Sequence, residues 1–267
     1  MDTRAIGVFD SGVGGLSAVR ALRALLPGED ILFLADTANV PYGTRTREDI
    51  CALSAAGARI LYGRGVKALL AACGTISANG LGAIAGAVPI PFCGVIEPAA
   101  AEAARVSRNR RVGVLSTEAT ARTGAIPRAI RAHGADIEVF AHGAGALVPL
   151  AEAGRTDYTD PEVRAAVDAS LAPFAGTGID TLVLGCTHFP LLSGAISGAV
   201  GAGVRLVDSG YAGARECVHM LAENELLSRR ASGGRLTCLV SGDTQAFAKA
   251  AAAFLPGGLE GVSIEKT

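Results

Sequence analysis

The sequence has 267 residues, of which 50% are hydrophobic and 18% charged, and its formal net charge is −1. A chain of this length can bury one large core or two modest ones, and it lacks the basic cluster that marks a nucleic-acid surface. No apolar run approaches the ~20 residues of a membrane-spanning helix, and the N-terminus MDTRAIGVFDSG carries an acid where a signal peptide carries basic residues. These features favour a cytoplasmic globular protein without nucleic-acid or membrane partners.

The first part of the chain alternates strands with helices. A glycine-rich loop, DSGVG at 10–14, follows the first strand and leads into a helix that ends at Pro27. Thr46 and Asp49 resemble a capping box for a helix that reaches about Tyr62. Strands are expected at residues 5–9 and 31–35, in the apolar run from 66 that ends at Cys73, and near 91–96.

From Arg111 the pattern restarts. Strands are expected at 112–115, at 137–140, in the run from 179 that ends at Cys186, and at 204–207. A helix is expected from the loop at 116–120 to about His133, and Pro161 marks the first turn of another. The first strands of the two parts of the chain start 112 − 5 = 107 residues apart, and the second strands start 137 − 31 = 106 residues apart. The two thiols are 186 − 73 = 113 residues apart. Such near-constant offsets indicate a duplicated α/β unit.

The C-terminal part begins with a second DSG at 208–210. An amphipathic helix to about Leu227, a strand at 236–240 and a helix at 244–254 follow, and they have no counterpart within 97–207. We therefore expect them to complete the first unit's sheet. The predicted fold class is α/β, with two similar doubly wound parallel-sheet domains related by pseudo-symmetry and an active site in the cleft between them. The predicted domains are residues 1–96 plus 208–267, and residues 97–207.

Six cysteines are present, without a CxxC pair or a Cys/His spacing that suits zinc. Cys51, Cys93, Cys217 and Cys238 read as small buried hydrophobic residues. Cys73 and Cys186 differ because each ends a buried strand, and ligands bind at the carboxyl ends of parallel strands. A helix that begins just beyond each thiol favours the thiolate form. Two thiols that face one cleft predict catalytic chemistry.

Short motifs spread over most of the chain point to one family. They are GVFDSGVGGLS at 7–17, DTANVPYG at 36–43, AACGTIS at 71–77, GVIEPA at 94–99, the loop with Thr117 and Thr120, Glu152, LGCTHFPLL at 184–192 and DSG at 208–210. Together they resemble the glutamate racemases of the cofactor-independent aspartate/glutamate racemase superfamily. The two cysteine motifs combined with DSGVGGLS and PYG are far more specific than any single motif.

The resemblance implies a two-base reaction on free glutamate that needs no cofactor or metal. One thiolate removes the α-proton and the thiol on the opposite face returns a proton, and Cys73 and Cys186 match these bases. Because the reference pKa of cysteine is about 8.5, a modest lowering gives thiolate at neutral pH. Asp10 resembles the carboxylate that assists Cys73, and His188 resembles the imidazole that assists Cys186. The family's members supply D-glutamate for peptidoglycan, and the resemblance also implies a homodimer.

The resemblance also assigns a wider set of substrate contacts. They are Asp10, Ser11, Tyr42, Gly43, Gly74, Thr75, Thr117, Thr120, Glu152, Thr187 and His188. Each has an ordinary alternative: Asp10 suits a helix N-cap, His188 a loop histidine and Glu152 an exposed helix position. Several of the others are typical of turns and caps.

Gly74 departs from the family pattern, which usually has asparagine at this position. Loss of the amide removes hydrogen-bonding groups from the pocket, so we expect weaker glutamate binding, which asparagine would restore. The alternative is a backbone conformation at Gly74 that asparagine would strain. Two other functions stay open: a related racemase that acts on aspartate or another small acid, and a binding protein that has lost turnover.

Overall fold

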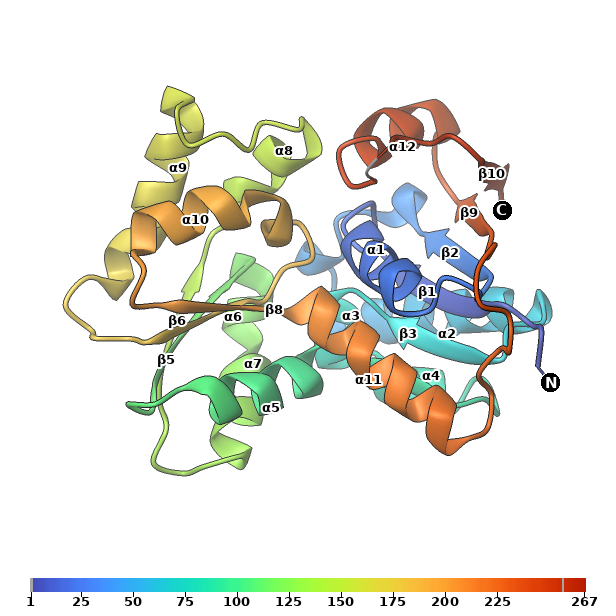
Figure 1. Cartoon of the computed structure of the whole chain (residues 1–267), viewed down its shortest axis with the longest axis horizontal. Coiled ribbons are helices and arrows are strands. Elements are labelled where there is room, and N and C mark those ends of the chain that lie inside the picture. The colour runs from blue at the N-terminus through green and yellow to red at the C-terminus, as the bar shows by residue number, and fades with distance from the viewer. Residues whose placement is uncertain (1, 256) are drawn as a thin grey trace.

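The computed structural model describes residues 2–255 and 257–267, and within them the strands form two parallel sheets (Figure 1). The first lobe, as we call it, holds a sheet in the spatial order β10 (Val262–Lys266), β9 (Leu236–Val240), β2 (Ile31–Ala35), β1 (Ile6–Asp10), β3 (Ala68–Ala71) and β4 (Phe92–Gly94). The second lobe holds β6 (Glu138–Gly143), β5 (Arg111–Ser116), β7 (Thr181–Leu184) and β8 (Arg205–Asp208). Every strand pairing in the described chain is parallel. The predicted α/β fold class with two parallel sheets is confirmed.

The two sheets share one strand order. In the first lobe β2, β1, β3 and β4 lie side by side, and in the second lobe β6, β5, β7 and β8 follow the same order. This agrees with the duplicated unit that the sequence offsets indicate. The strand expected at 236–240 is β9, which joins the first sheet beside β2. The division into domains at 1–96 plus 208–267 and 97–207 stays a prediction.

Helices flank both sheets. Around the first sheet are α1 (Leu16–Leu25), α2 (Arg47–Gly63), α3 (Gly74–Asn79), α4 (Leu81–Ala85), α11 (Ser209–Glu223) and α12 (Thr244–Ala251). Around the second are α5 (Ile96–Val106), α6 (Glu118–Thr123), α7 (Ala125–Ala132), α8 (Leu147–Glu152), α9 (Pro161–Leu171) and α10 (Ser193–Val200). Short 3-10 turns lie at η1 (Thr37–Asn39), η2 (Tyr42–Thr44), η3 (Ala172–Phe174) and η4 (Phe189–Leu192). Helix α11 packs against both α1 and α5, so it contacts both lobes.

Local sequence rules account for most helix ends. The Thr46 side chain accepts a hydrogen bond from the Asp49 N–H, which confirms the predicted cap of α2. The helix expected to reach His133 is instead split into α6 and α7, because Gly124 adopts a left-handed conformation with φ of 61°. The amphipathic helix predicted to reach Leu227 ends earlier, at Glu223. Strand β10 was not predicted, since its side chains are half-buried or exposed and form no apolar run.

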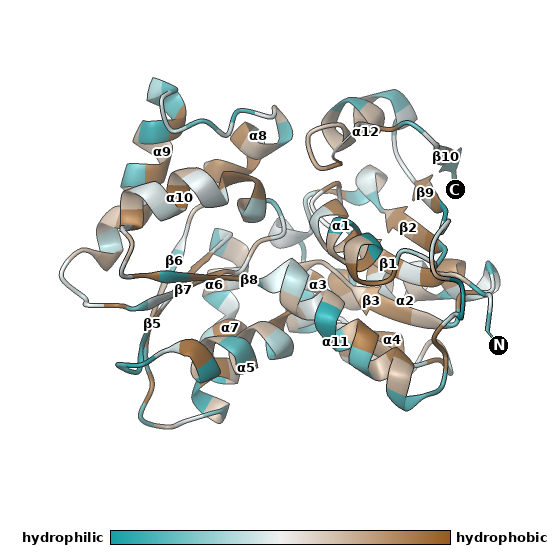
Figure 2. Ribbon diagram, viewed as in Figure 1, coloured by the Kyte–Doolittle hydropathy of each residue, from teal (hydrophilic) through white to brown (hydrophobic). Residues whose placement is uncertain are grey.

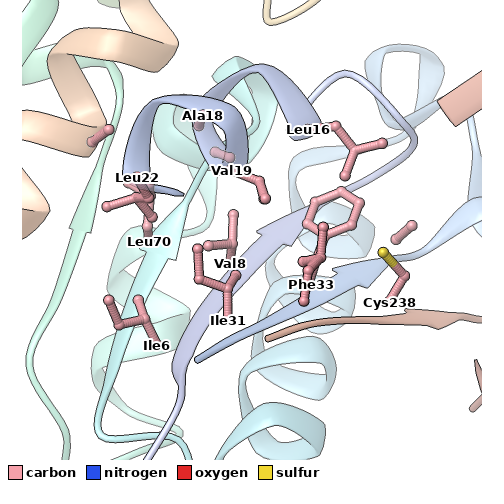
Figure 3. Close-up of a cluster of buried hydrophobic side chains, with 14 of the residues drawn as sticks. Ile6, Val8, Leu16, Ala18, Val19, Leu22, Ile31, Phe33, Leu70 and Cys238 are labelled. Atoms are coloured by element: carbon pink, nitrogen blue, oxygen red, sulfur yellow. The ribbon is translucent and has the colours of Figure 1, made fainter. Parts of the chain in front are cut away.

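The strand interiors form the cores. Figure 2 shows that the strands of the first sheet are mostly hydrophobic, whereas the helices mix hydrophobic and hydrophilic residues. Figure 3 shows Leu16, Val19 and Leu22 of α1 over Val8 and Phe33 of the sheet, and all five side chains are buried. Because both faces of a parallel sheet are covered, its polar groups reach solvent or ligand chiefly at strand ends. No helix in the described part of the chain is long and apolar enough to cross a membrane.

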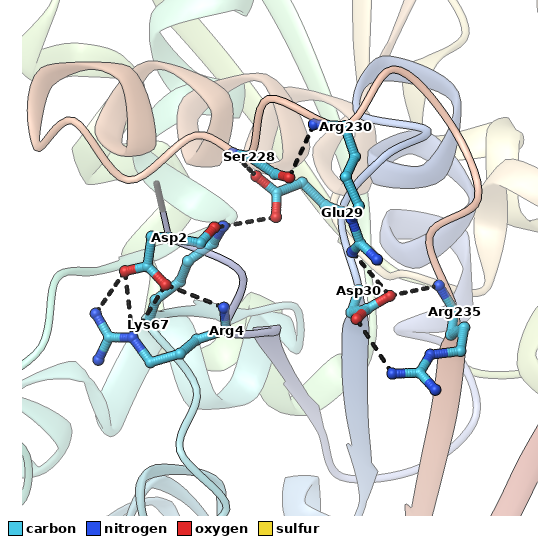
Figure 4. Close-up of polar contacts among 8 residues, drawn as sticks. All are labelled: Asp2, Arg4, Glu29, Asp30, Lys67, Ser228, Arg230 and Arg235. Atoms are coloured by element: carbon cyan, nitrogen blue, oxygen red, sulfur yellow. Dashed lines mark hydrogen bonds and ion pairs between the residues drawn. The ribbon is translucent and has the colours of Figure 1, made fainter.

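A buried ion pair ties several segments of the first lobe together (Figure 4). Lys67 Nζ lies 2.6 Å from Glu29 Oε2, and the two side chains are 0% and 3% exposed. The same ammonium group donates to the Asp2 carbonyl, and Glu29 accepts from the Ser228 N–H. The pair therefore connects the N-terminal residues, the turn before β2, the start of β3 and the segment that leads to β9.

Replacing Lys67 with methionine is expected to lower the free energy of unfolding by about 3–5 kcal/mol, because it leaves the Glu29 carboxylate buried without its partner. Urea unfolding measures this loss. Arg64→Met is the matched control, since Arg64 pairs with Glu265 at the surface, where both side chains are almost half exposed. An exposed pair contributes less than about 1 kcal/mol. Equal losses in the two variants would contradict the assigned role of the buried pair.

Candidate active site

A cavity of about 730 Å³ is lined by residues of both lobes. Every residue that the sequence assigned to catalysis or substrate binding lines it: Asp10, Ser11, Tyr42, Gly43, Cys73, Gly74, Thr75, Thr117, Thr120, Glu152, Cys186, Thr187 and His188. Cys73 follows β3 of the first lobe, and Cys186 follows β7 of the second. The structure thus brings together, at the carboxyl ends of equivalent strands, two thiols that are far apart in the sequence.

Cys73 lies in a tight polar environment at the start of α3, where it is the N-cap residue. Its sulfur is 3.5 Å from Ser11 Oγ. Burial, followed by the negative charge of Asp10, raises the pKa of Cys73 to about 11, although hydrogen bonds from Ser11 and from the Ile76 N–H act in the opposite direction. The prediction that the helix N-terminus makes this thiol acidic is therefore wrong, because burial outweighs the short helix. In the free protein Cys73 carries its proton at neutral pH.

Asp10 is the last residue of β1 and is only 2% exposed. Its Oδ1 accepts from the Gly12 N–H at 2.7 Å, and its Oδ2 accepts from the Thr187 hydroxyl at 3.3 Å. Burial raises the pKa of Asp10 against the effect of these hydrogen bonds and the His188 charge. The helix N-cap alternative is wrong, since Gly15 occupies the N-cap of α1. Asp10 instead contacts both lobes, because Thr187 adjoins the second thiol.

Cys186 has a different set of partners. Its sulfur is 3.6 Å from His188 Nδ1, and His188 Nε2 is 3.0 Å from Glu152 Oε1 at the end of α8. Burial lowers the pKa of His188, but hydrogen bonds to Cys186 and Glu152 overcome it and raise the pKa to about 10. An imidazolium ion at this site donates a hydrogen bond to both neighbours. The ring also packs edge-on against Phe254 of the first lobe, with ring centroids 5.6 Å apart.

The remaining predicted contacts are hydroxyl and backbone groups around the two thiols. Thr117 is the N-cap of α6 and donates its hydroxyl proton to Thr120 Oγ1 at 3.1 Å. Tyr42 and Gly43 belong to η2, and Thr75 follows Gly74 in α3. Of the cavity residues, only Arg122 is an arginine or lysine. A negatively charged group bound in the cavity would therefore meet mainly N–H and O–H donors.

Sequence reasoning missed two parts of this site. Asp36 accepts hydrogen bonds from the Tyr42 hydroxyl and the Ser241 hydroxyl, each at 2.6 Å. Burial and the bond to Asp36 raise the pKa of Tyr42, so its hydroxyl stays a donor. Helix α12 supplies a further wall through Ala246, Phe247 and Ala250. The strand-end position of Asp36 could have been noticed, whereas the place of α12 depends on β9 lying beside β2.

No group of three or more His, Cys, Asp or Glu residues in the described ranges is arranged to hold a metal ion.

Each of the two parallel α/β lobes places a strand-end thiol in the shared cavity. This arrangement is typical of an enzyme that binds a small molecule between its lobes. Comparison with known proteins gives the family. The chain belongs to the Asp/Glu/hydantoin racemase family, which it matches over residues 16–217, and this membership makes it an isomerase.

Individual relatives agree over almost the full length. The glutamate racemase of Geobacter metallireducens is 41% identical over 97% of this chain and 95% of the relative. The crystal structure of a glutamate racemase isoform from Bacillus anthracis is 30% identical, with a TM-score of 0.92 over 100% of this chain and 98% of the other. The Francisella tularensis glutamate racemase, solved in complex with D-glutamate, is 32% identical, with a TM-score of 0.89 over 99% of this chain and 98% of the other.

Proposed function

We propose that this protein interconverts L- and D-glutamate without an added cofactor, by proton transfer at the α-carbon between Cys73 and Cys186. The observation that carries the proposal is the position of the two thiols, one from each lobe, in a single cavity. Inversion of a tetrahedral carbon needs a base on one face and an acid on the other. The similar proteins named above, including one solved with D-glutamate, favour glutamate as the substrate.

The surroundings of the thiols support the following roles in the proposed reaction. Cys73 is protonated and serves as the acid, whereas Cys186, beside the His188 imidazolium, serves as the base. As the Cys186 thiolate removes the α-proton, the carbon–hydrogen bond breaks and the electron pair stays on the substrate. Donation of the Cys73 proton to the opposite face then completes inversion, and the reverse reaction uses the thiols in exchanged roles. Asp10 and the pair His188–Glu152 assist the two transfers.

The carbanion formed in this reaction has to be stabilised by donors already in place. Hydroxyl groups of Ser11, Thr75 and Thr187, together with N–H groups of the adjacent loops, lie around the cavity and suit the substrate carboxylates. Tyr42, Gly43, Gly74, Thr117 and Thr120 complete the proposed substrate contacts. Because these groups are held by strand ends and helix starts, they need little rearrangement during the reaction.

Proton exchange tests the assignment directly. In deuterated water and without added cofactor, either glutamate enantiomer should lose its optical activity and acquire deuterium at the α-carbon. If aspartate or another acid exchanges its α-proton while glutamate does not, the protein is a related racemase with a different substrate. The absence of exchange with any free amino acid would indicate a binding protein without turnover.

Three further properties implied by the family resemblance belong to the same proposal: supply of D-glutamate for peptidoglycan, a cytoplasmic location and assembly as a homodimer. Sedimentation that gives the mass of one chain, 26.8 kDa, would rule out the homodimer. Fractionation of cells tests the location, and dependence of a depleted strain on added D-glutamate tests the metabolic role.

A further inference from the structure

The loop at residues 36–44 forms one wall of the cavity and has little regular structure. Its lining residues are Thr37, Val40, Pro41, Tyr42, Gly43 and Thr44. Between residues 36 and 44, all of which the structure describes, the regular elements are the short turns η1 and η2. Single 3-10 turns have few backbone hydrogen bonds of their own. The arrangement of this loop therefore depends on the side chains that hold it.

The Asp36 side chain holds the 36–44 loop from within. Its Oδ2 accepts from the Tyr42 hydroxyl at 2.6 Å, and Asn39 Nδ2 donates to both carboxylate oxygens at 3.0 Å. The Asn39 carbonyl in turn accepts from Arg45 Nε at 2.7 Å. A single carboxylate thus joins η1, which contains Asn39, to η2, which contains Tyr42.

The turn that follows β9 fixes Asp36 and its neighbours from outside the loop. Ser241 Oγ donates to Asp36 Oδ1 at 2.6 Å and accepts from the Ala38 N–H at 3.0 Å. The Gly242 N–H donates to Thr37 Oγ1 at 3.0 Å. Three hydrogen bonds therefore join two segments that are more than 200 residues apart in the sequence.

The backbone of this turn is itself firmly held. The Ser241 N–H donates to the Ala35 carbonyl at the end of β2, at 3.1 Å. Lys266 Nζ of β10 donates to the Ser241 carbonyl at 2.6 Å and to the Gly242 carbonyl. The Ser241 hydroxyl is thus offered from a fixed position on the sheet. Because Ser241 does not line the cavity, its effect on a bound molecule has to pass through the 36–44 loop.

We propose that Ser241 is a positioning residue that keeps the 36–44 loop in its substrate-binding arrangement before the substrate arrives. The inference rests on the proposed function, since it concerns the same cavity and the same substrate. A ligand that needs the ordered loop binds more weakly when only a fraction of the molecules has the loop in place. Ser241 therefore sets the affinity for glutamate and leaves the proton transfers to the thiols, which other strands hold.

Ser241→Ala removes both side-chain hydrogen bonds and leaves the backbone bonds of the turn in place. We expect the Michaelis constant for glutamate to rise on the order of tenfold, the size that loss of a hydrogen bond to a carboxylate can reach. The value of kcat should stay almost constant, because saturating substrate restores the ordered loop. Steady-state kinetics with each glutamate enantiomer measure both quantities.

Two further variants serve as controls for Ser241→Ala. Ser241→Thr keeps the hydroxyl group and should keep the Michaelis constant of the unchanged protein. Ser263→Ala removes a hydroxyl group from an exposed position in β10 of the same sheet. It should change neither the Michaelis constant nor kcat.

Amide hydrogen exchange of the ligand-free protein gives a measurement that does not depend on activity. The Ala38 N–H, which the Ser241 hydroxyl accepts, should exchange faster in Ser241→Ala than in the unchanged protein. The Ala72 N–H donates to the Phe9 carbonyl at 2.8 Å in the core of the same lobe, and its exchange rate should not change. A general loss of stability would instead speed exchange at both amides.

Three results would overturn the inference: an unchanged Michaelis constant in Ser241→Ala, a loss confined to kcat, or unchanged exchange at Ala38. A Ser241→Ala variant that does not fold, or that exchanges faster at Ala72 as well, would also overturn it, since Ser241 would then serve the fold as a whole. Failure of the proposed function is recognised separately. The unchanged protein would then exchange no α-proton of glutamate, whereas the amide measurement would still decide whether Ser241 orders the loop.

Discussion

Replacement of Cys73 or Cys186 with alanine is expected to abolish racemisation, with kcat reduced on the order of 10⁴-fold, the upper range for a positioned acid or base. Each variant retains the other thiol with its own partners, so we expect it to exchange the α-proton of only one glutamate enantiomer with solvent. Cys73→Ala retains the Cys186 base and should exchange the α-proton of one glutamate enantiomer with deuterated water. Cys186→Ala retains only Cys73, whose pKa is about 11, so its exchange of the other enantiomer should be slower at neutral pH and rise as the pH approaches that value. Polarimetry and proton NMR on each pure enantiomer measure these two outcomes.

Cys51→Ala is the control for these variants. Cys51 lies in α2 and is half-buried, and it does not line the cavity. Its replacement should leave kcat within twofold of the unchanged protein, in the range of ordinary substitutions away from a site. Near-normal racemisation by either cavity variant would exclude the two-thiol reaction. Exchange of the same enantiomer by both would show that the thiols do not serve opposite faces.

His188→Ala is expected to lower kcat by about 10²-fold or more, because it removes the cation that supports Cys186. The pKa of His188 is raised to about 10, so the imidazolium is present at neutral pH and is lost as the pH rises through that value. Activity of the unchanged protein should therefore decline above about pH 10. Glu152→Gln removes one of the groups that raise the pKa of His188, so the decline should begin at lower pH.

His133→Ala is a matched control for His188→Ala. His133 Nε2 lies 2.7 Å from Glu97 Oε1, so it forms a similar histidine–glutamate pair, but neither residue lines the cavity. Its replacement should change neither kcat nor the pH profile. An alkaline decline in Glu152→Gln at the same pH as in the unchanged protein would contradict the role assigned to Glu152.

The positions of the thiols could be predicted from the sequence because they depend on local pattern. A buried apolar run that ends at a cysteine marks a strand end, and strands alternating with helices place those ends at one edge of a parallel sheet. The cap at Thr46 and the strand at 236–240 follow from equally local rules. All the residues chosen by pattern and resemblance accordingly line one cavity.

The rest depends on distances that the sequence does not contain. Glu152 reaches His188 because of where α8 lies, although the Glu152 side chain is 44% exposed and has the position of an ordinary surface residue. Phe247 lines the cavity because β9 pairs with β2, a choice of neighbour that periodicity does not reveal. The raised pKa of Cys73 reflects how deeply the thiol is buried, whereas the motif around it indicates only that a helix begins just beyond the thiol, which favours thiolate.

The shared strand order of the two sheets has a thermodynamic consequence for the proposed reaction. Mirror-image molecules have equal free energies in water, so the equilibrium constant between them is one, and kcat/KM has to be equal in the two directions at every pH. Equivalent strands, β3 and β7, deliver the two sulfur atoms, which suits a reaction whose two directions are mirror images. Their neighbours, however, are unequal: a carboxyl group beside Cys73 and an imidazole beside Cys186. Because of this inequality kcat can differ between the two enantiomers, but only if their Michaelis constants differ by the same factor, so the neighbours of the thiols decide which enantiomer saturates the enzyme first.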